Sequence, residues 1–158
     1  MSLIELRTLY NQTKVVPVES LIQRPSVYGV IRHNGKLLVA EGAFTGRYVL
    51  PGGGIEKGED VKAALIREVR EETSIEVEVG EFLHFMTDLF YYDPLDLAMQ
   101  GFMFFYACKP LTTELVTPDY PAIEGLVKPL WVDIDQLSAE SFQAHGEIIM
   151  ELLRRGET

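Results

Sequence analysis

The sequence predicts an α/β layered domain with a mixed sheet and two main helices. Two observations carry this prediction. Short runs rich in Val, Ile, Tyr and Phe are joined by tight-turn signals, as in antiparallel hairpins. Two segments with helical spacing, one in the middle of the chain and one at its end, interrupt these runs. Strands interrupted by helices, together with hairpins, are typical of a sheet covered by helices.

The first elements are a hairpin and a short strand. Residues 27–32 and 37–40 are β-like runs joined by Asn34 and Gly35, the strongest short hairpin signal. Residues 48–50 form a short strand that ends at Pro51 and three glycines. Residues 1–24 are harder to read, because Pro17 interrupts short apolar runs, and we expect an N-terminal arm or an edge strand there.

A helix is expected to follow the glycines and to end near Thr73. Asp60 suits its N-cap, where a carboxylate accepts hydrogen bonds from the exposed N–H groups of the first turn. Val61, Leu65 and Val69 recur at helical spacing and predict the face that packs on the sheet.

The remaining elements are four strands and a helix. Residues 75–79 and 82–92 are predicted as two strands, 101–108 and 130–132 as two more, and residues 93–96 as a turn. The C-terminal helix is predicted from residues at helical spacing that end before a glycine. These are Phe142, His145, Ile149, Leu152 and Leu153, with Gly156 as the stop.

The composition limits the class of protein. The chain has 158 residues, 47% of them hydrophobic and 24% charged, which indicates one globular domain over 1–158. No apolar run is long enough for a membrane span, and the single cysteine, Cys108, predicts a cytoplasmic protein. The net charge of −10 argues against nucleic acid as a partner, but it permits a small phosphorylated ligand that arrives with cations.

Three glutamates on the central helix indicate a metal site. Glu68, Glu71 and Glu72 stand at helical offsets of zero, three and four, so their side chains share one face. Like charges at this spacing cost a helix about 0.2–0.5 kcal/mol per pair, unless a positive charge compensates them. The alternative is a solvated acidic face, which does not explain the glycine-rich backbone before the helix. A hard divalent cation explains both features.

The segment that contains these residues resembles the Nudix box of the Nudix (MutT-type) hydrolase family. Gly53 opens the pattern, Glu59 follows after five residues, and Arg67-Glu68 follow after seven more. Val69, the pair Glu71-Glu72 and Ile75 complete it. Ser74 is the only departure, since the family has glycine there. The resemblance implies a Nudix-like α/β/α sandwich with a mixed, partly antiparallel sheet.

The resemblance also implies roles for the residues of the box. Gly52, through its carbonyl, and Glu68, Glu71 and Glu72 would bind Mg²⁺ or Mn²⁺, for which oxygen ligands are suited. Arg67 is close enough along the helix to pair with Glu71, and Glu59 would support the metal site. Glu68 or Glu71 is the first candidate for the base that activates water, and Glu124 is a loop candidate for the metal site. The alternative for Glu124 is an exposed loop acid.

The implied reaction is hydrolysis of a nucleoside diphosphate linked to another moiety, with a dNTP or a related nucleotide as substrate. Among the cations around the helix in sequence, Arg47 is our candidate for phosphate contact, and a solvated surface is the alternative. Tyr91 and Tyr92 fall where the family places a tyrosine linked to dinucleoside polyphosphates, although a core position is the alternative. A homodimer is expected at the level of the family only.

Two competing interpretations remain. The first is a nucleotide-sensing or protein-binding module that kept the fold and lost catalysis; the intact acidic positions argue against it. The second is a prenyl diphosphate isomerase, which would need a cysteine in the site, where Cys108 is poorly placed. We expect Ser74 to affect stability and loop shape and not metal chemistry, because glycine after a helix end usually has positive φ.

Overall fold

The computed structural model describes residues 2–119 and 126–155. Its strands are β1 (Leu3–Thr8), β2 (Thr13–Pro17), β3 (Ile22–His33), β4 (Lys36–Gly42), β5 (Tyr48–Val49), β6 (Gly52–Gly54), β7 (Val77–Tyr92), β8 (Leu97–Pro110) and β9 (Leu126–Asp133). Its helices are α1 (Val61–Thr73) and α2 (Gly146–Arg155), with 3-10 turns η1 (Val18–Ser20), η2 (Asp93–Leu95), η4 (Ile134–Gln136) and η5 (Ala139–Ser141). None of these helices is long and apolar enough to cross a membrane, within the part of the chain that the structure describes.

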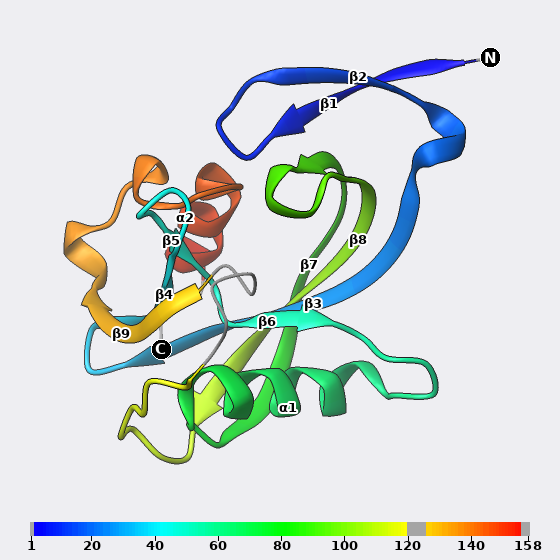
Figure 1. Cartoon of the computed structure of the whole chain (residues 1–158). Helices are drawn as coiled ribbons and strands as arrows, with labels where there is room; N and C mark the ends of the chain where they lie inside the picture. The colour runs from blue at the N-terminus through cyan, green and yellow to red at the C-terminus, as the bar shows by residue number, and fades with distance from the viewer. Residues whose placement is uncertain (1, 120–125, 156–158) are drawn as a thin grey trace.

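The strands form one mixed sheet, and α1 and α2 lie on opposite sides of it (Figure 1). The strand order is β2-β1-β7-β8-β3-β4-β5, with β6 paired to β3 and β9 to β4. Strand β3 runs parallel to β8, and β1 runs parallel to β7, whereas the other pairs are antiparallel. The predicted α/β/α sandwich with a mixed sheet and two main helices is therefore confirmed.

Alternation along the central strands builds a hydrophobic core on each side of the sheet. Leu37 and Val39 of β4 belong to the cluster that contains Leu152 of α2. Leu38, between them, belongs to the cluster that contains Leu65 and Val69 of α1. All three β4 residues are fully buried. Because successive side chains of a strand point to opposite faces, one strand anchors both helices.

The predicted hairpin and the start of the central helix are confirmed. Asn34 and Gly35 have φ of 49° and 75° and connect β3 to β4, as a two-residue turn with positive φ requires. The carboxylate of Asp60 accepts hydrogen bonds from the backbone N–H groups of Lys62 and Ala63, at 3.1 and 3.4 Å. The helix ends at Thr73, as predicted.

Two predictions of element bounds are wrong. Residues 75–79 and 82–92 were expected as separate strands, but β7 is continuous, and its pairing with β8 shifts register around Gly80. A bulge absorbs extra residues without ending a strand. The last helix begins at Gly146, so Phe142 and His145 precede it. His145 has φ of 59°, which is not helical. Gly156 lies outside the described residues.

The N-terminal segment borders the sheet. Strand β2 is at its edge and pairs with β1, which in turn pairs with the end of β7 through Arg7 and Phe90. This arrangement brings residues from the start of the chain beside the end of β7 (Figure 1).

Ser74 follows α1 with φ of 66°, in the left-handed region where a side chain is disfavoured. We expect Ser74→Gly to stabilise the protein by about 1 kcal/mol and to raise the melting temperature by a few degrees. The expected turnover is that of the unsubstituted protein, because the hydrogen bond of the Ser74 N–H goes to the Arg70 carbonyl and not to the glycine turn. Thermal denaturation and a steady-state assay check both expectations, and a lower melting temperature in the variant contradicts them.

Candidate active site

The glycine turn and the acidic face of α1 lie together. The N–H of Gly52, in β6, donates a hydrogen bond of 2.9 Å to Oε1 of Glu72, a side chain that is largely buried. A Cβ placed on Gly53 would lie 2.7 Å from the carboxyl carbon of Glu68. The backbone of the turn therefore packs directly on two of the three helix carboxylates. Glu71 is further out, with 49% of its side chain exposed.

Arg67 joins the acidic residues to one another. Its guanidinium donates to both carboxylate oxygens of Glu59, at 2.7 and 2.9 Å, and to Glu68 at 3.1 Å. It also reaches Glu71 at 3.3 Å and the carbonyl of Gly54 at 3.1 Å. The pair with Glu71 has the spacing expected on one helix face. The positive charge of Arg67 thus neutralises part of the acidic cluster. Its hydrogen bonds to Gly54 and Glu59 hold the segment before α1 against the helix.

The acidic residues differ in their proton affinity. Burial raises the pKa of Glu68, although the neighbouring Arg67 opposes this effect. The hydrogen bonds from Arg67 lower the pKa of Glu59 to about 2. Glu59 is therefore a fixed anion near neutral pH, whereas Glu68 is the carboxylate that is better able to accept a proton.

The ion pair between Glu59 and Arg67 predicts a dependence of stability on pH. The folded-state pKa of Glu59 lies near 2, below its ordinary value of 4.5. Its stabilising contribution is then fully present above about pH 4.5 and is lost as the pH falls toward 2. We expect Glu59→Gln to lower the melting temperature at pH 7 and to have little effect at pH 2. A constant difference in melting temperature across this range would contradict the expectation.

The residues fit a hard divalent cation by the chemistry of their donors. Carboxylates and backbone carbonyls are the ligands that Mg²⁺ and Mn²⁺ prefer, and Gly53 leaves room for the Glu68 carboxylate against the backbone. No three acidic, histidine or cysteine side chains of the described residues already converge on one point, since Arg67 lies between Glu68 and Glu71.

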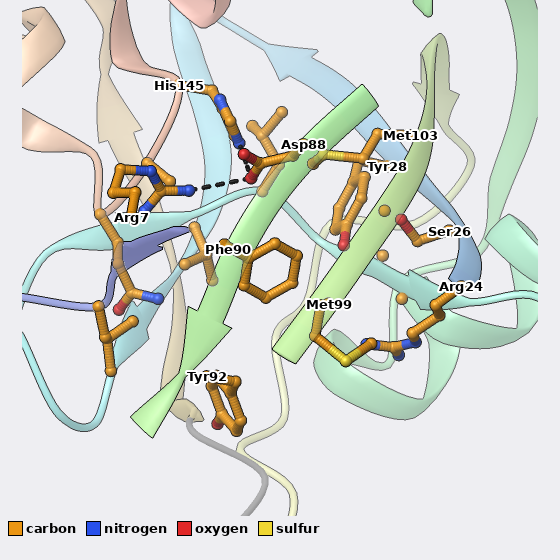
Figure 2. A pocket seen from close by; sticks show the side chains of 18 of the residues that line it. Arg7, Arg24, Ser26, Tyr28, Asp88, Phe90, Tyr92, Met99, Met103 and His145 are labelled. Atoms are coloured by element: carbon orange, nitrogen blue, oxygen red, sulfur yellow. Dashed lines mark hydrogen bonds and ion pairs between the residues drawn. The ribbon is translucent and has the colours of Figure 1, made fainter. Parts of the chain in front are cut away.

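A cavity of about 580 Å³ opens beside the carboxylates. Its floor is one face of the sheet, because alternate residues of three strands line it. Arg24, Ser26 and Tyr28 come from β3, and Figure 2 shows them with residues from the neighbouring strands. The contributions of β7 are Asp88, Phe90, Tyr91 and Tyr92, and those of β8 are Leu97, Met99, Gly101, Met103 and Phe105. Glu68 and Glu72 line the same cavity.

The structure brings together most of the residues singled out in the sequence. Gly52, Tyr91 and Tyr92 line the cavity, although Tyr91 is only 7% exposed and packs on β1 and β2. Arg47 is exposed on the turn between β4 and β5 and is not among the lining residues. Glu124 lies outside the described residues. Cys108 is largely buried beneath α1, and burial raises its thiol pKa to about 12.

Several lining residues carried no signal in the sequence. Arg24 lies beside Gly54, with guanidinium atoms 2.8 Å from the position of an added Cβ there. Arg7 and His145 both contact Asp88, at 2.9 and 2.8 Å. These residues come from β1, β7 and the segment before α2, so only the fold makes them neighbours. Alternation along β7 would have linked Asp88 to Tyr92, but it would not have identified their partners.

The close approach of Gly53 to Glu68 predicts the effect of a single methyl group. In Gly53→Ala the added Cβ would displace the end of the flexible Glu68 side chain. We expect activity to fall about 100-fold, because small misplacements of reacting groups have effects of this size. Gly29→Ala, whose added Cβ would meet Ile31 and Cys108 in the core beneath α1 and not Glu68, should retain activity. Circular dichroism checks the fold, and normal kinetics for Gly53→Ala would contradict the expectation.

Comparison with known proteins agrees with this fold. The NUDIX domain model matches residues 22–152, and the chain therefore belongs to the Nudix family. Nucleoside triphosphatase NudI of Enterobacter sp. (strain 638) is 40% identical over 62 residues, which are 36% of this chain and 44% of that protein. The ADP-ribose pyrophosphatase of Methanocaldococcus jannaschii is 38% identical over 61 residues, 37% of this chain and 36% of that protein. The chain thus spans less than half of these relatives.

Solved structures show the same fold across nearly the whole chain. A NUDIX family hydrolase from Clostridium perfringens superposes with a TM-score of 0.66 at 17% identity, covering 87% of this chain and all of that chain. A MutT NUDIX hydrolase from Burkholderia pseudomallei gives 0.63 at 18% identity, with 84% of this chain and 98% of that chain covered. At these identities the likeness establishes the architecture.

Proposed function

We propose that the protein is a divalent-metal-dependent hydrolase of nucleoside diphosphate derivatives, with water attacking a pyrophosphate phosphorus. The observation that carries this proposal is the packing of Glu68 and Glu72 against Gly52 and Gly53 at the edge of a cavity of about 580 Å³. A cavity of this size is in the range of small-molecule sites. The relatives named as nucleoside triphosphatase and ADP-ribose pyrophosphatase act on compounds of this class.

Glu68, Glu71, Glu72 and the Gly52 carbonyl are the residues that would hold Mg²⁺ or Mn²⁺. The bound metal would neutralise the diphosphate and polarise the P–O bond that breaks. Arg67 is the residue that holds Glu68 and Glu71 when the cation is absent, since its guanidinium contacts both. The hydrogen bond from Gly52 orients Glu72.

Arg24 is our candidate for phosphate contact in place of Arg47. It lines the cavity on the same side as Glu68, beside Gly54, and is itself positively charged. An arginine donates paired hydrogen bonds to phosphate oxygens and stabilises the charge that develops on them. Arg24 would thus bring the diphosphate to the carboxylates of α1 and compensate part of the net negative charge.

Glu68 is the better of the two candidates for the general base, because burial raises its pKa whereas Glu71 is half exposed. In the step we propose, the oxygen of water forms a bond to phosphorus as its proton passes to the carboxylate. The P–O bond of the anhydride breaks, and its electron pair stays on the departing phosphate or nucleotide. Each product is then a phosphate ester, free phosphate or pyrophosphate.

The test is a panel of nucleotides incubated with the pure protein. It contains dNTPs, oxidised dNTPs, nucleotide sugars, ADP-ribose and dinucleoside polyphosphates, each with and without Mg²⁺ and Mn²⁺. We expect metal-dependent release of phosphate, pyrophosphate or a nucleoside monophosphate from at least one compound. Nucleotide binding without turnover of any compound would instead indicate a sensing or protein-binding module, and turnover that does not depend on metal would refute the proposed mechanism.

A further inference from the structure

A row of three residues crosses the floor of the cavity. Gly101 of β8 is in register with Asp88 of β7 on one side and with Arg24 of β3 on the other. Adjacent strands are about 4.8 Å apart, so the backbones of the acid and the arginine are separated by about 10 Å. Gly101 has no side chain between them and is itself buried. The ring of Phe90 borders this position, 3.5 Å from where a Cβ of Gly101 would stand.

The acidic end of this row has an unused acceptor. Arg7 Nη2 and His145 Nε2 both contact Oδ2 of Asp88, at 2.9 and 2.8 Å (Figure 2). No hydrogen bond from the described residues reaches Oδ1, and none of their side-chain polar atoms is both buried and unpaired. Oδ1 is therefore accessible, on a residue that lines the cavity.

The partners of Asp88 keep it ionised. Burial alone would raise its pKa, but the hydrogen bonds and charges of His145 and Arg7 outweigh burial, and the pKa is lowered. Near neutral pH the carboxylate only accepts hydrogen bonds. Arg7, whose contact with Asp88 uses one nitrogen, is 34% exposed at its side chain and lines the same cavity. This end of the cavity thus offers acceptors and donors side by side.

We propose that Asp88 and Arg7 form a subsite for a guanine base, which lies over Gly101 with its phosphates toward Arg24. The proposal rests on the proposed function, since it names the nucleotide that the same cavity takes. Guanine carries two adjacent N–H donors next to a carbonyl oxygen. The donors match the open carboxylate oxygen of Asp88, and the carbonyl matches the remaining N–H groups of Arg7.

Other bases fit this end of the cavity less well. Hypoxanthine lacks the 2-amino group and offers the carboxylate one donor fewer. Adenine has no carbonyl for Arg7, and it places a ring acceptor where guanine has an N–H. Phe90 and Tyr92 share the face of β7 with Asp88 and provide aromatic surface for stacking, which any base can use. Discrimination therefore depends on Asp88 and Arg7.

Calorimetric binding of GMP, IMP and AMP tests the subsite without hydrolysis, because these nucleotides contain no phosphoanhydride bond. We expect GMP to bind at least about 10-fold more tightly than IMP or AMP. This factor corresponds to the lower end of the range for losing one hydrogen bond to a charged group. Asp88→Asn should reduce GMP binding to the level of IMP. Arg7→Gln should weaken GMP and IMP and leave AMP unchanged. Asp96→Asn, an exposed residue near Lys14, is the matched control and should behave as the unsubstituted protein.

Three results would overturn the subsite: undetectable GMP binding, no preference for GMP, or a preference that survives in folded Asp88→Asn. If thermal denaturation shows that Asp88→Asn does not fold, Arg7→Gln is the deciding variant. Its ratio of GMP to AMP affinity should fall, and an unchanged ratio would overturn the subsite. An enzyme that hydrolyses nucleotides without base preference would refute the subsite alone. A protein that prefers GMP and hydrolyses nothing would refute the proposed function alone.

Discussion

Glu68→Gln is expected to lower kcat by about 100-fold to 1,000-fold while the fold is preserved, since it removes both a proposed metal ligand and the candidate base. Glu71→Gln and Glu72→Gln should each lower kcat by orders of magnitude as well. The loss in Glu72→Gln has a second cause, because its Oε1 accepts the hydrogen bond that fixes Gly52. Steady-state kinetics at saturating Mg²⁺ measure these effects.

Glu78→Gln is the matched control for these substitutions. Glu78 is exposed on β7, in register with Lys109, and is not among the residues that line the cavity. Its kcat should equal that of the unsubstituted protein. If Glu68→Gln, Glu71→Gln and Glu72→Gln were all near normal, the acidic face of α1 would have no role in catalysis.

Removal of Arg67 should have the second largest effect. Arg67→Ala removes the guanidinium that forms ion pairs with Glu59, Glu68 and Glu71. Because these groups are partly exposed to solvent, we expect a loss of about 1–2 kcal/mol in the free energy of unfolding. We also expect at least a 10-fold loss in kcat, since the segment that contains Gly54 and Glu59 is no longer held to α1. Urea denaturation and steady-state kinetics measure the two losses.

The same helix offers a control for Arg67. Arg70 forms a pair with Glu76 through two hydrogen bonds of 2.6 Å, on an exposed surface. Arg70→Ala removes an equal charge from α1, but exposed pairs contribute little to stability, so it should cost less than Arg67→Ala and leave kcat normal. Added Mg²⁺ should restore part of the stability of Arg67→Ala and little of that of Arg70→Ala. Equal behaviour of the two variants would show that the position of Arg67 has no special role.

The parts of the fold that the sequence predicts are those decided by local chemistry. The turn at Asn34 and Gly35, the N-cap Asp60 and the end of α1 at Thr73 each depend on residues within a few positions of one another. The continuity of β7 through Gly80 does not depend on nearby residues alone, because a bulge is defined by pairing with the partner strand β8. Helical spacing predicts His145 in a helix, but in the structure it has a non-helical φ and contacts Asp88, 57 residues away.

The same distinction applies to the candidate site. The glycine turn and the acidic helix form one continuous segment, so their association could be predicted from spacing. Arg7 and Asp88 are 81 residues apart in sequence and meet only because β1 adds to the edge of β7. Arg47 is nearer to the acidic helix in sequence but does not line the cavity. Arg24 is farther from the helix in sequence, and it does line the cavity.

The central claim is that the carboxylates of α1 hold a divalent cation against a diphosphate. Isothermal titration calorimetry with Mg²⁺ or Mn²⁺, with and without a nucleoside diphosphate, tests it most directly. We expect saturable uptake that is stronger with nucleotide present and strongly weakened in Glu68→Gln. No uptake of either ion by the folded protein, even with nucleotide, would contradict the claim.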